Sequence, residues 1–223
     1  SWADRQEDAI NKPHRPIPSG ELSEGGARRY TMVLLAISVA YPVVFWHSIT
    51  TLVLFYLFPL LGLLYSAGPR LKRNPITAAI TTSLILVAPM MLGYTMHSAD
   101  QSILPFFGGL FGFCLGAIPL KDIEDEEGDV AAGLGNWMAR LGSRKLLGYA
   151  SVVMTADLVY VTLMPIALAQ KLYLWAFAGG ALLTLLVFMA LKLHADKIYR
   201  TIIRVVIVSG VVIFLVQRFG GAS

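Results

Sequence analysis

Long apolar runs separated by short charged segments dominate this sequence. Seven of them approach the length of about 20 mostly apolar residues that a membrane-spanning helix needs; they cover residues 30–46, 49–66, 75–97, 103–120, 146–169, 172–193 and 201–216. A bilayer offers no water to backbone N–H and C=O groups, so only helices and closed barrels span it. The runs lack the alternating pattern of barrel strands. The sequence therefore predicts an all-α fold, a multi-spanning transmembrane helix bundle.

The composition supports a membrane protein and excludes most soluble folds. Apolar residues make up 56% of the 223 residues and charged residues only 14%, against about 25% charged residues in ordinary soluble domains. The net charge is +4, but the basic residues form neither a continuous stripe nor a nucleic-acid-reading motif. We therefore expect the lipid bilayer as a partner and no nucleic acid.

The charged residues gather on one side of the predicted bundle. If the seven runs alternate in direction, every Lys and Arg except Lys171 and Arg218 falls on the same side. The acids follow them, with Asp100 and Asp157 as the two exceptions. Loops rich in Lys and Arg remain on the cytoplasmic side of a membrane. The predicted location is an integral, multi-pass membrane protein whose polar chemistry lies on the cytoplasmic side.

Two acidic clusters fall on that side, one in each half of the chain. Asp4 and Asp8 are four residues apart, so on a helix both carboxylates project from the same face. A proline-rich segment, residues 11–20, follows and should end this helix. The second cluster, residues 121–129, repeats the spacing with Asp125 and Asp129. The repeated spacing predicts two pairs of carboxylates that act together.

Oxygen ligands without neighbouring Cys or His pairs favour a hard cation, and Mg²⁺ is typically held by one or two carboxylates plus substrate phosphates. Lys12, Arg15, Lys72 and Arg73 fall on the same side and can bind the outer phosphate oxygens. A diphosphate substrate satisfies both groups of residues. The alternative, that these are solvated charges at the membrane edge, explains the repeated acid spacing less well.

These motifs resemble those of the UbiA superfamily of intramembrane prenyltransferases. Its first motif, NxxxDxxxD followed by a segment like NKPxRPxPSG, matches Asp4, Asp8 and residues 11–20; its Asn would precede Ser1. Its second motif, in a KDIxDxxGD setting, matches residues 121–129. A third motif, YxxxK, has a more widely spaced counterpart in Tyr65, Lys72 and Arg73.

The resemblance implies roles for individual residues. The implied catalytic residues are Asp4, Asp8, Asp122, Asp125 and Asp129, of which Asp4, Asp8, Asp125 and Asp129 would bind Mg²⁺. The implied substrate-binding residues are Asn11, Lys12, Arg15, Tyr65, Lys72 and Arg73. Members of the superfamily have nine helices, so we expect residues 1–223 to form a single transmembrane prenyltransferase domain that lacks the first two. Residues 1–29 and 121–145 would carry the two Asp motifs and their cytoplasmic loops.

The function implied is Mg²⁺-dependent transfer of a polyprenyl group, in isoprenoid biosynthesis, from a prenyl diphosphate to a small acceptor. That acceptor would be aromatic, as in quinone or chlorophyll synthesis, or a glycerol-phosphate lipid. A terpene cyclase of the same superfamily, which captures the cation internally, is the alternative. A cation transporter would need acids near the bilayer centre, where the sequence places only Asp157.

Two features inside the runs have their own expectations. Asp157 should face the protein interior, either in a structural hydrogen bond between helices or near the acceptor. Gly108, Gly112 and Gly116 recur at helical intervals, which suits close helix packing. We expect these glycines to be structural.

Overall fold

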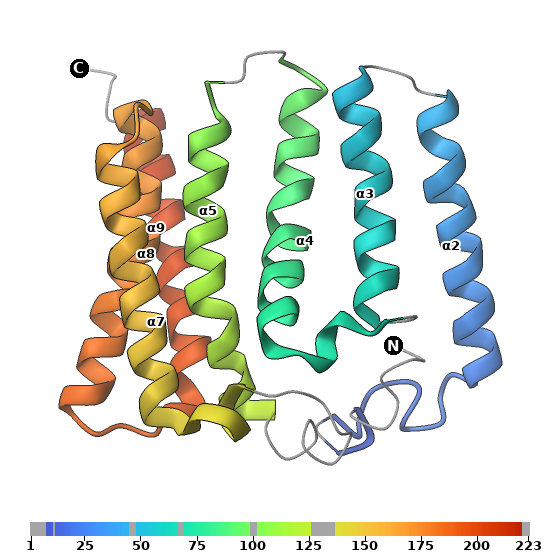
Figure 1. Cartoon of the computed structure of the whole chain (residues 1–223), viewed down its shortest axis with the longest axis horizontal. Helices are drawn as coiled ribbons and strands as arrows, with labels where there is room; N and C mark the ends of the chain where they lie inside the picture. The colour runs from blue at the N-terminus through green and yellow to red at the C-terminus, as the bar shows by residue number, and fades with distance from the viewer. Residues whose placement is uncertain are drawn as a thin grey trace. The chain divides into compact units, whose positions relative to one another are not determined.

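The computed structural model describes residues 8–10, 12–44, 48–66, 69–98, 102–125 and 137–219. All regular structure in these ranges is helical (Figure 1). The long helices are α2 (Glu24–Val44), α3 (Ile49–Ser66), α4 (Pro75–Thr95), α5 (Leu104–Ala117), α7 (Trp137–Leu163), α8 (Leu168–Ala190) and α9 (Ile198–Phe219). Short 3₁₀ helices, η2 (Leu71–Arg73), η3 (Ile118–Lys121) and η4 (Ala195–Lys197), adjoin α4, α5 and α9. The all-α prediction is confirmed.

Within the described ranges, six helices are long and apolar enough to cross a membrane: Ile49–Ser66, Pro75–Thr95, Leu104–Asp125, Arg140–Leu163, Leu168–Ala190 and Ala195–Phe219. They correspond to six of the seven predicted spans. The run at 30–46 forms α2, which is not among the six. Arg28 and Arg29 lie in its first two turns and reduce its mean hydropathy. The seventh span therefore stays a prediction.

Residues at the helix ends explain several boundaries. Asn74 caps α4, because its side chain accepts a hydrogen bond of 2.9 Å from the Ile76 backbone N–H. Ser23 caps α2 in the same way through the Gly26 N–H, at 3.1 Å. We predicted that one helix would run to residue 169, but α7 ends at Leu163. Pro165 accounts for the difference, since proline disfavours helical backbone just before it.

The chain divides into two compact units. Unit 1 comprises Ser1–Ala99 and Asp125–Ala139, and unit 2 comprises Asp100–Glu124 and Arg140–Ser223. In unit 1, α3 packs against both α2 and α4, and η2 packs against α3 and α4 (Figure 1). In unit 2, α8 packs against α5 and α9, and η3 packs against α9.

Close contacts between α5 and α7 depend on glycine. A Cβ atom at Gly112 would lie 3.0 Å from Cγ of Asp157, and one at Gly116 would lie 3.0 Å from Cγ of Met154. Near Gly108, the Tyr160 hydroxyl donates a hydrogen bond of 3.2 Å to the carbonyl of Pro105. Small residues let helix backbones approach closely in a membrane. The predicted structural role of these glycines agrees with this packing.

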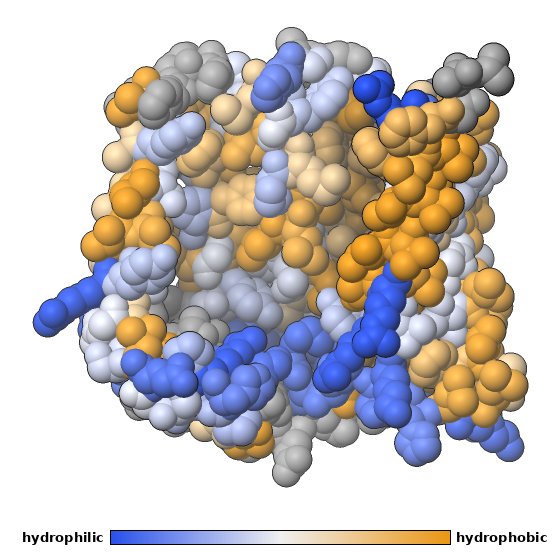
Figure 2. All heavy atoms as spheres, turned by 180° about the vertical axis from the view of Figure 1, so that it is seen from behind, coloured by the Kyte–Doolittle hydropathy of each residue, from blue (hydrophilic) through white to orange (hydrophobic). Residues whose placement is uncertain are grey.

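The molecular surface separates by polarity as a membrane protein requires. On the face drawn in Figure 2, hydrophobic side chains extend along the helices and hydrophilic side chains gather near helix ends. Many large apolar residues are exposed, for example Leu163 at 74% and Phe219 at 68%. Lipid, unlike water, accommodates such residues favourably, which supports an integral membrane protein.

Candidate functional site

The first acidic motif ends a helix and continues into a series of turns. Residues 8–10 are helical, and the Lys12 backbone N–H still bonds to the Asp8 carbonyl at 2.8 Å. Pro13 follows directly and ends the helix, as predicted. Gly20 then adopts a φ of 82°, a value that favours glycine. This local structure holds the basic residues of the segment close to Asp8.

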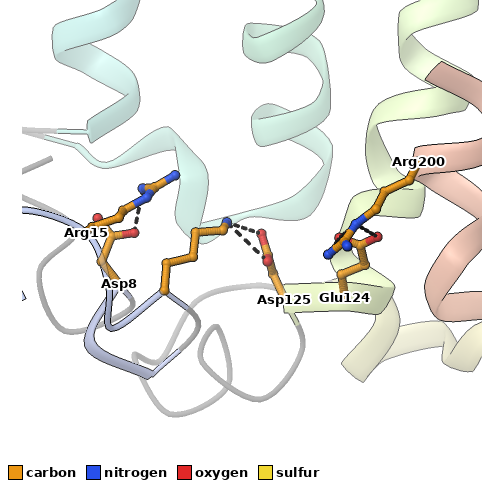
Figure 3. Close-up of polar contacts among 6 residues, drawn as sticks. Asp8, Arg15, Glu124, Asp125 and Arg200 are labelled. Atoms are coloured by element: carbon orange, nitrogen blue, oxygen red, sulfur yellow. Dashed lines mark hydrogen bonds and ion pairs between the residues drawn. The ribbon is translucent and has the colours of Figure 1, made fainter. Parts of the chain in front are cut away.

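Asp8 is paired within its own motif. Nη1 of Arg15 donates a hydrogen bond of 2.7 Å to Oδ1 of Asp8, as Figure 3 shows. The Asp8 residue is only 7% exposed. A buried carboxylate without a compensating charge is costly, and the Arg15 guanidinium supplies that charge beside Asp8.

The two acidic motifs meet through Lys12. Its Nζ lies 3.3 Å from both Oδ1 and Oδ2 of Asp125, although 113 residues separate the two positions. Both residues belong to unit 1. Asp125 is buried, with 8% of its surface exposed. The structure therefore places an acid of the second motif beside a base of the first.

The residues of the predicted third motif also lie in unit 1. Tyr65 is half-buried in the last turn of α3. Lys72 is buried in η2 and Arg73 is exposed. The 3₁₀ turn starts after Arg70, whose φ of 50° turns the chain sharply. The role of these residues in substrate binding stays a prediction.

Part of the predicted site lies outside the described residues. Asp4, Asn11 and Asp129 belong to segments that the structure does not describe. Asp122 is described; it is half-buried and belongs to unit 2. No group of three or more His, Cys, Asp or Glu able to hold a metal occurs in the described ranges.

Two contacts near the second motif were not predicted. Arg200, in the first turn of α9, pairs with Glu124 of the motif, with 3.0 Å between Nε and Oε1. Trp137, the first residue of α7, donates a hydrogen bond of 3.0 Å from its indole N–H to the carbonyl of Pro75. Both contacts join residues more than 60 positions apart, and no local spacing indicates them. The gathering of bases and acids on one side was the only available signal for the first.

The chain matches a known family over nearly its whole length. The family model of the UbiA prenyltransferase family matches residues 1–214 of the chain. The chain belongs to the UbiA prenyltransferase family. Members of this family are prenyltransferases and are generally metal-dependent. The resemblance found in the sequence motifs is thereby confirmed.

Several curated relatives are similar over most of the chain. A digeranylgeranylglyceryl phosphate synthase of Methanothrix thermoacetophila is 31% identical over 168 residues, which cover 75% of this chain and 61% of that protein. The chloroplastic chlorophyll synthase of Arabidopsis thaliana is 35% identical over 153 residues, which cover 64% of this chain and 39% of that protein. The matched part of the chain thus spans about two fifths to three fifths of these relatives.

A solved structure supports the same fold. A digeranylgeranylglyceryl phosphate synthase studied in membranes aligns with a TM-score of 0.65 at 19% sequence identity. The alignment covers 95% of this chain and 77% of that one. At this identity the likeness shows the fold of the family and nothing about the substrate.

Proposed function

We propose that this protein transfers a prenyl group from a prenyl diphosphate to a small acceptor within the membrane, in a reaction that requires Mg²⁺. One contact carries the proposal: Lys12 of the first motif pairs with Asp125 of the second. It brings a buried carboxylate of the second motif to the segment that holds Asp8. Family membership and the named relatives support the same chemistry.

The chemistry of the donors fits Mg²⁺. Asp8 and Asp125 offer only oxygen ligands, and Mg²⁺ commonly uses one or two carboxylates together with substrate phosphates. Asp8 and Asp125 would hold the ion, with Asp4 and Asp129 as further ligands proposed from the motif alone. Bound there, the metal supplies positive charge that stabilises the diphosphate leaving group.

The basic residues would take over a second task when substrate binds. Arg15 and Lys12 each contact a buried carboxylate, and their remaining N–H donors would bind phosphate oxygens. Lys72, Arg73, Tyr65 and Asn11 are further candidates for this binding. As the allylic C–O bond breaks, both electrons leave with the diphosphate, and these cations stabilise the growing negative charge.

The acceptor then reacts with the allylic carbon and completes the transfer. Its nucleophilic atom forms a bond to the allylic carbon, its proton is released, and diphosphate departs. The apolar helices exclude water, which would otherwise capture the allylic carbon. The relatives' names point to acceptors of the glycerol-phosphate lipid or chlorophyllide type. We propose a location on the cytoplasmic side, which the positive-inside pattern of the sequence supports.

Incubation of the full-length protein in lipid nanodiscs tests the proposal. Geranylgeranyl diphosphate would be supplied with a prenylated glycerol phosphate or with chlorophyllide, and the products analysed by mass spectrometry. We expect a prenylated acceptor in the presence of Mg²⁺ and none with a chelator. Cyclised hydrocarbon formed without acceptor would contradict transfer and indicate the cyclase alternative, which the named relatives do not favour.

Substitutions assign the activity to the proposed site. Asp8→Ala and Asp125→Ala should each lower the rate at least 100-fold in protein that still folds. Asp196→Ala is the matched control, since Asp196 is an exposed acid of η4 and should leave the rate within about twofold. Full activity in either site variant would refute the assignment.

A further inference from the structure

The helix that carries the second acidic motif ends in an electrostatically unfavourable way. The helical segment Leu104–Asp125 comprises α5, η3 and a last turn, and that turn contains Asp122, Glu124 and Asp125. The C-terminal end of a helix carries a partial negative charge, so acids there are destabilising. Cations beside this turn therefore stabilise it, as Lys12 does at Asp125.

Arg200 supplies such a cation from a distant part of the sequence. Its Nε lies 3.0 Å from Oε1 of Glu124, and its Nε and Nη2 each donate to Oε2 at 3.2 Å. Figure 3 shows the guanidinium facing the Glu124 carboxylate. Two donors on one carboxylate fix orientation as well as distance. A lysine at this position could not reproduce that geometry.

The helix that carries Arg200 is well anchored. Ile198 and Ile202, on either side of Arg200 in α9, are fully buried, and α9 packs against η3 and α8. Leu120 and Pro119 of η3 are also fully buried. Arg200 and Glu124 both belong to unit 2. The ion pair therefore links the motif turn to a packed part of its own unit.

We propose that Arg200 is a positioning residue for the second acidic motif. It holds Glu124 and thereby sets the rotation of the helical turn that presents Asp122 and Asp125. It touches neither metal nor substrate. The inference rests on the proposed function, since it assigns Arg200 a part in presenting the proposed metal ligand Asp125. Groups that orient metal ligands from outside typically change metal affinity or activity 10-fold to 100-fold when removed.

The Mg²⁺ concentration that gives half-maximal activity is the measurement that tests this role. We expect Arg200→Gln to raise it about 10-fold, with an unchanged melting temperature in the absence of Mg²⁺. Arg200→Lys should give an intermediate increase because one charge remains without the second donor. Arg204→Gln is the matched control: Arg204 lies one turn further along α9 and is exposed, so its loss should change the value by less than twofold.

A double-mutant cycle shows whether Arg200 acts through Glu124. We expect the Arg200→Gln/Glu124→Gln double variant to need no more Mg²⁺ for half-maximal activity than the more impaired single variant. Multiplied effects of the two substitutions would overturn the proposal, as would an unchanged Mg²⁺ requirement in both Arg200→Gln and Arg200→Lys. Failure of the proposed function has a different signature, namely full activity in Asp125→Ala. If Asp125→Ala is inactive while the Arg200 variants need no extra Mg²⁺, only the positioning role fails.

Discussion

The two units of the chain differ in what their interiors contain. Most of the large side chains that are fully buried in the described residues belong to unit 2, among them Leu120, Leu146, Met154, Leu174 and Leu185. The buried residues described in unit 1 are mostly small or polar, such as Ser83, Ala79 and Thr51, with Pro75 and Val87 as larger apolar ones. Unit 1 instead buries the carboxylates of Asp8 and Asp125, which pair with the exposed Arg15 and the half-buried Lys12.

The packed side chains of unit 2 and the paired charges of unit 1 should contribute differently to stability and activity. Interdigitated apolar side chains and close backbone approach stabilise helices in a membrane, and unit 2 has both. Paired buried charges contribute little net stability, but they fix the positions of the groups involved. We therefore expect conservative changes in the interior of unit 2 to lower stability, and changes of the paired residues in unit 1 to lower activity. Each of the following predictions tests that division.

The largest effect should come from truncation of a fully buried leucine in unit 2. Leu174→Ala in α8 removes a side chain with 0% exposure and should destabilise the protein by about 2–5 kcal/mol. The value should fall near the lower limit because lipid is itself apolar, so chiefly packing is lost. Thermal unfolding in detergent measures the change. Leu60→Ala, at a position of α3 that is 50% exposed, is the control from unit 1.

Equal melting temperatures for the Leu174→Ala and Leu60→Ala variants would contradict the division. A large loss of stability in Leu60→Ala alone would reverse the division, because α3 would then depend on close packing at this position.

Glycine substitutions should give the next largest effect. In Gly109→Ala, the new Cβ would lie 2.7 Å from Cδ1 of Leu174 and 3.1 Å from Cγ2 of Val161. Both neighbours are fully buried, so relief requires helix displacement, and overpacking of this kind costs about 1–3 kcal/mol. Gly93→Ala in α4 meets no atom within 4 Å and should be tolerated. The melting temperatures of the two variants make the comparison directly.

The helices of this fold were largely predictable, because hydropathy and length decide which segments a bilayer accepts. Their boundaries were less so. The run at 146–169 is mostly apolar, yet α7 starts earlier, at Trp137, and ends before Pro165. The start has a further irregularity at Gly142, where φ is 71° and ψ is 161°, a conformation that is essentially restricted to glycine.

The candidate site was predictable where its residues form local motifs. Asp8, Arg15 and Lys12 are close in sequence, and their spacing in the motif indicates a shared role. The sequence placed the two acidic motifs on one side, but neither the spacing nor the resemblance predicted the pairing of Lys12 with Asp125 or of Arg200 with Glu124. Contacts of this kind depend on how helices pack, which hydropathy does not specify.

A smaller effect is expected at Trp137, the first residue of α7, which belongs to unit 1. Trp137→Phe keeps the aromatic volume but removes the hydrogen bond to the Pro75 carbonyl. A neutral hydrogen bond contributes about 0.5–1.5 kcal/mol, so the melting temperature should fall by a few degrees at most. Activity should fall more than stability, because Trp137 closely follows the second acidic motif. Parallel assays of rate and melting temperature, with Trp175→Phe as the control indole in unit 2, distinguish the two effects.

The smallest effect is expected at Asp157, which lies inside α7. It is the one buried acid in the described part of unit 2. Asp157 is 5% exposed, and its Oδ2 has no hydrogen-bond partner among the described residues. The predicted hydrogen bond between helices is thus not found for this oxygen.

Leaving a buried polar group unsatisfied costs about 1–3 kcal/mol. Asp157→Val, which removes this group at similar size, should therefore raise stability by about 1 kcal/mol while the rate stays within twofold. A rate at least 10-fold lower in a variant of equal or higher melting temperature would show that Asp157 serves the reaction, and that the division between a packed unit 2 and a charged unit 1 is incomplete.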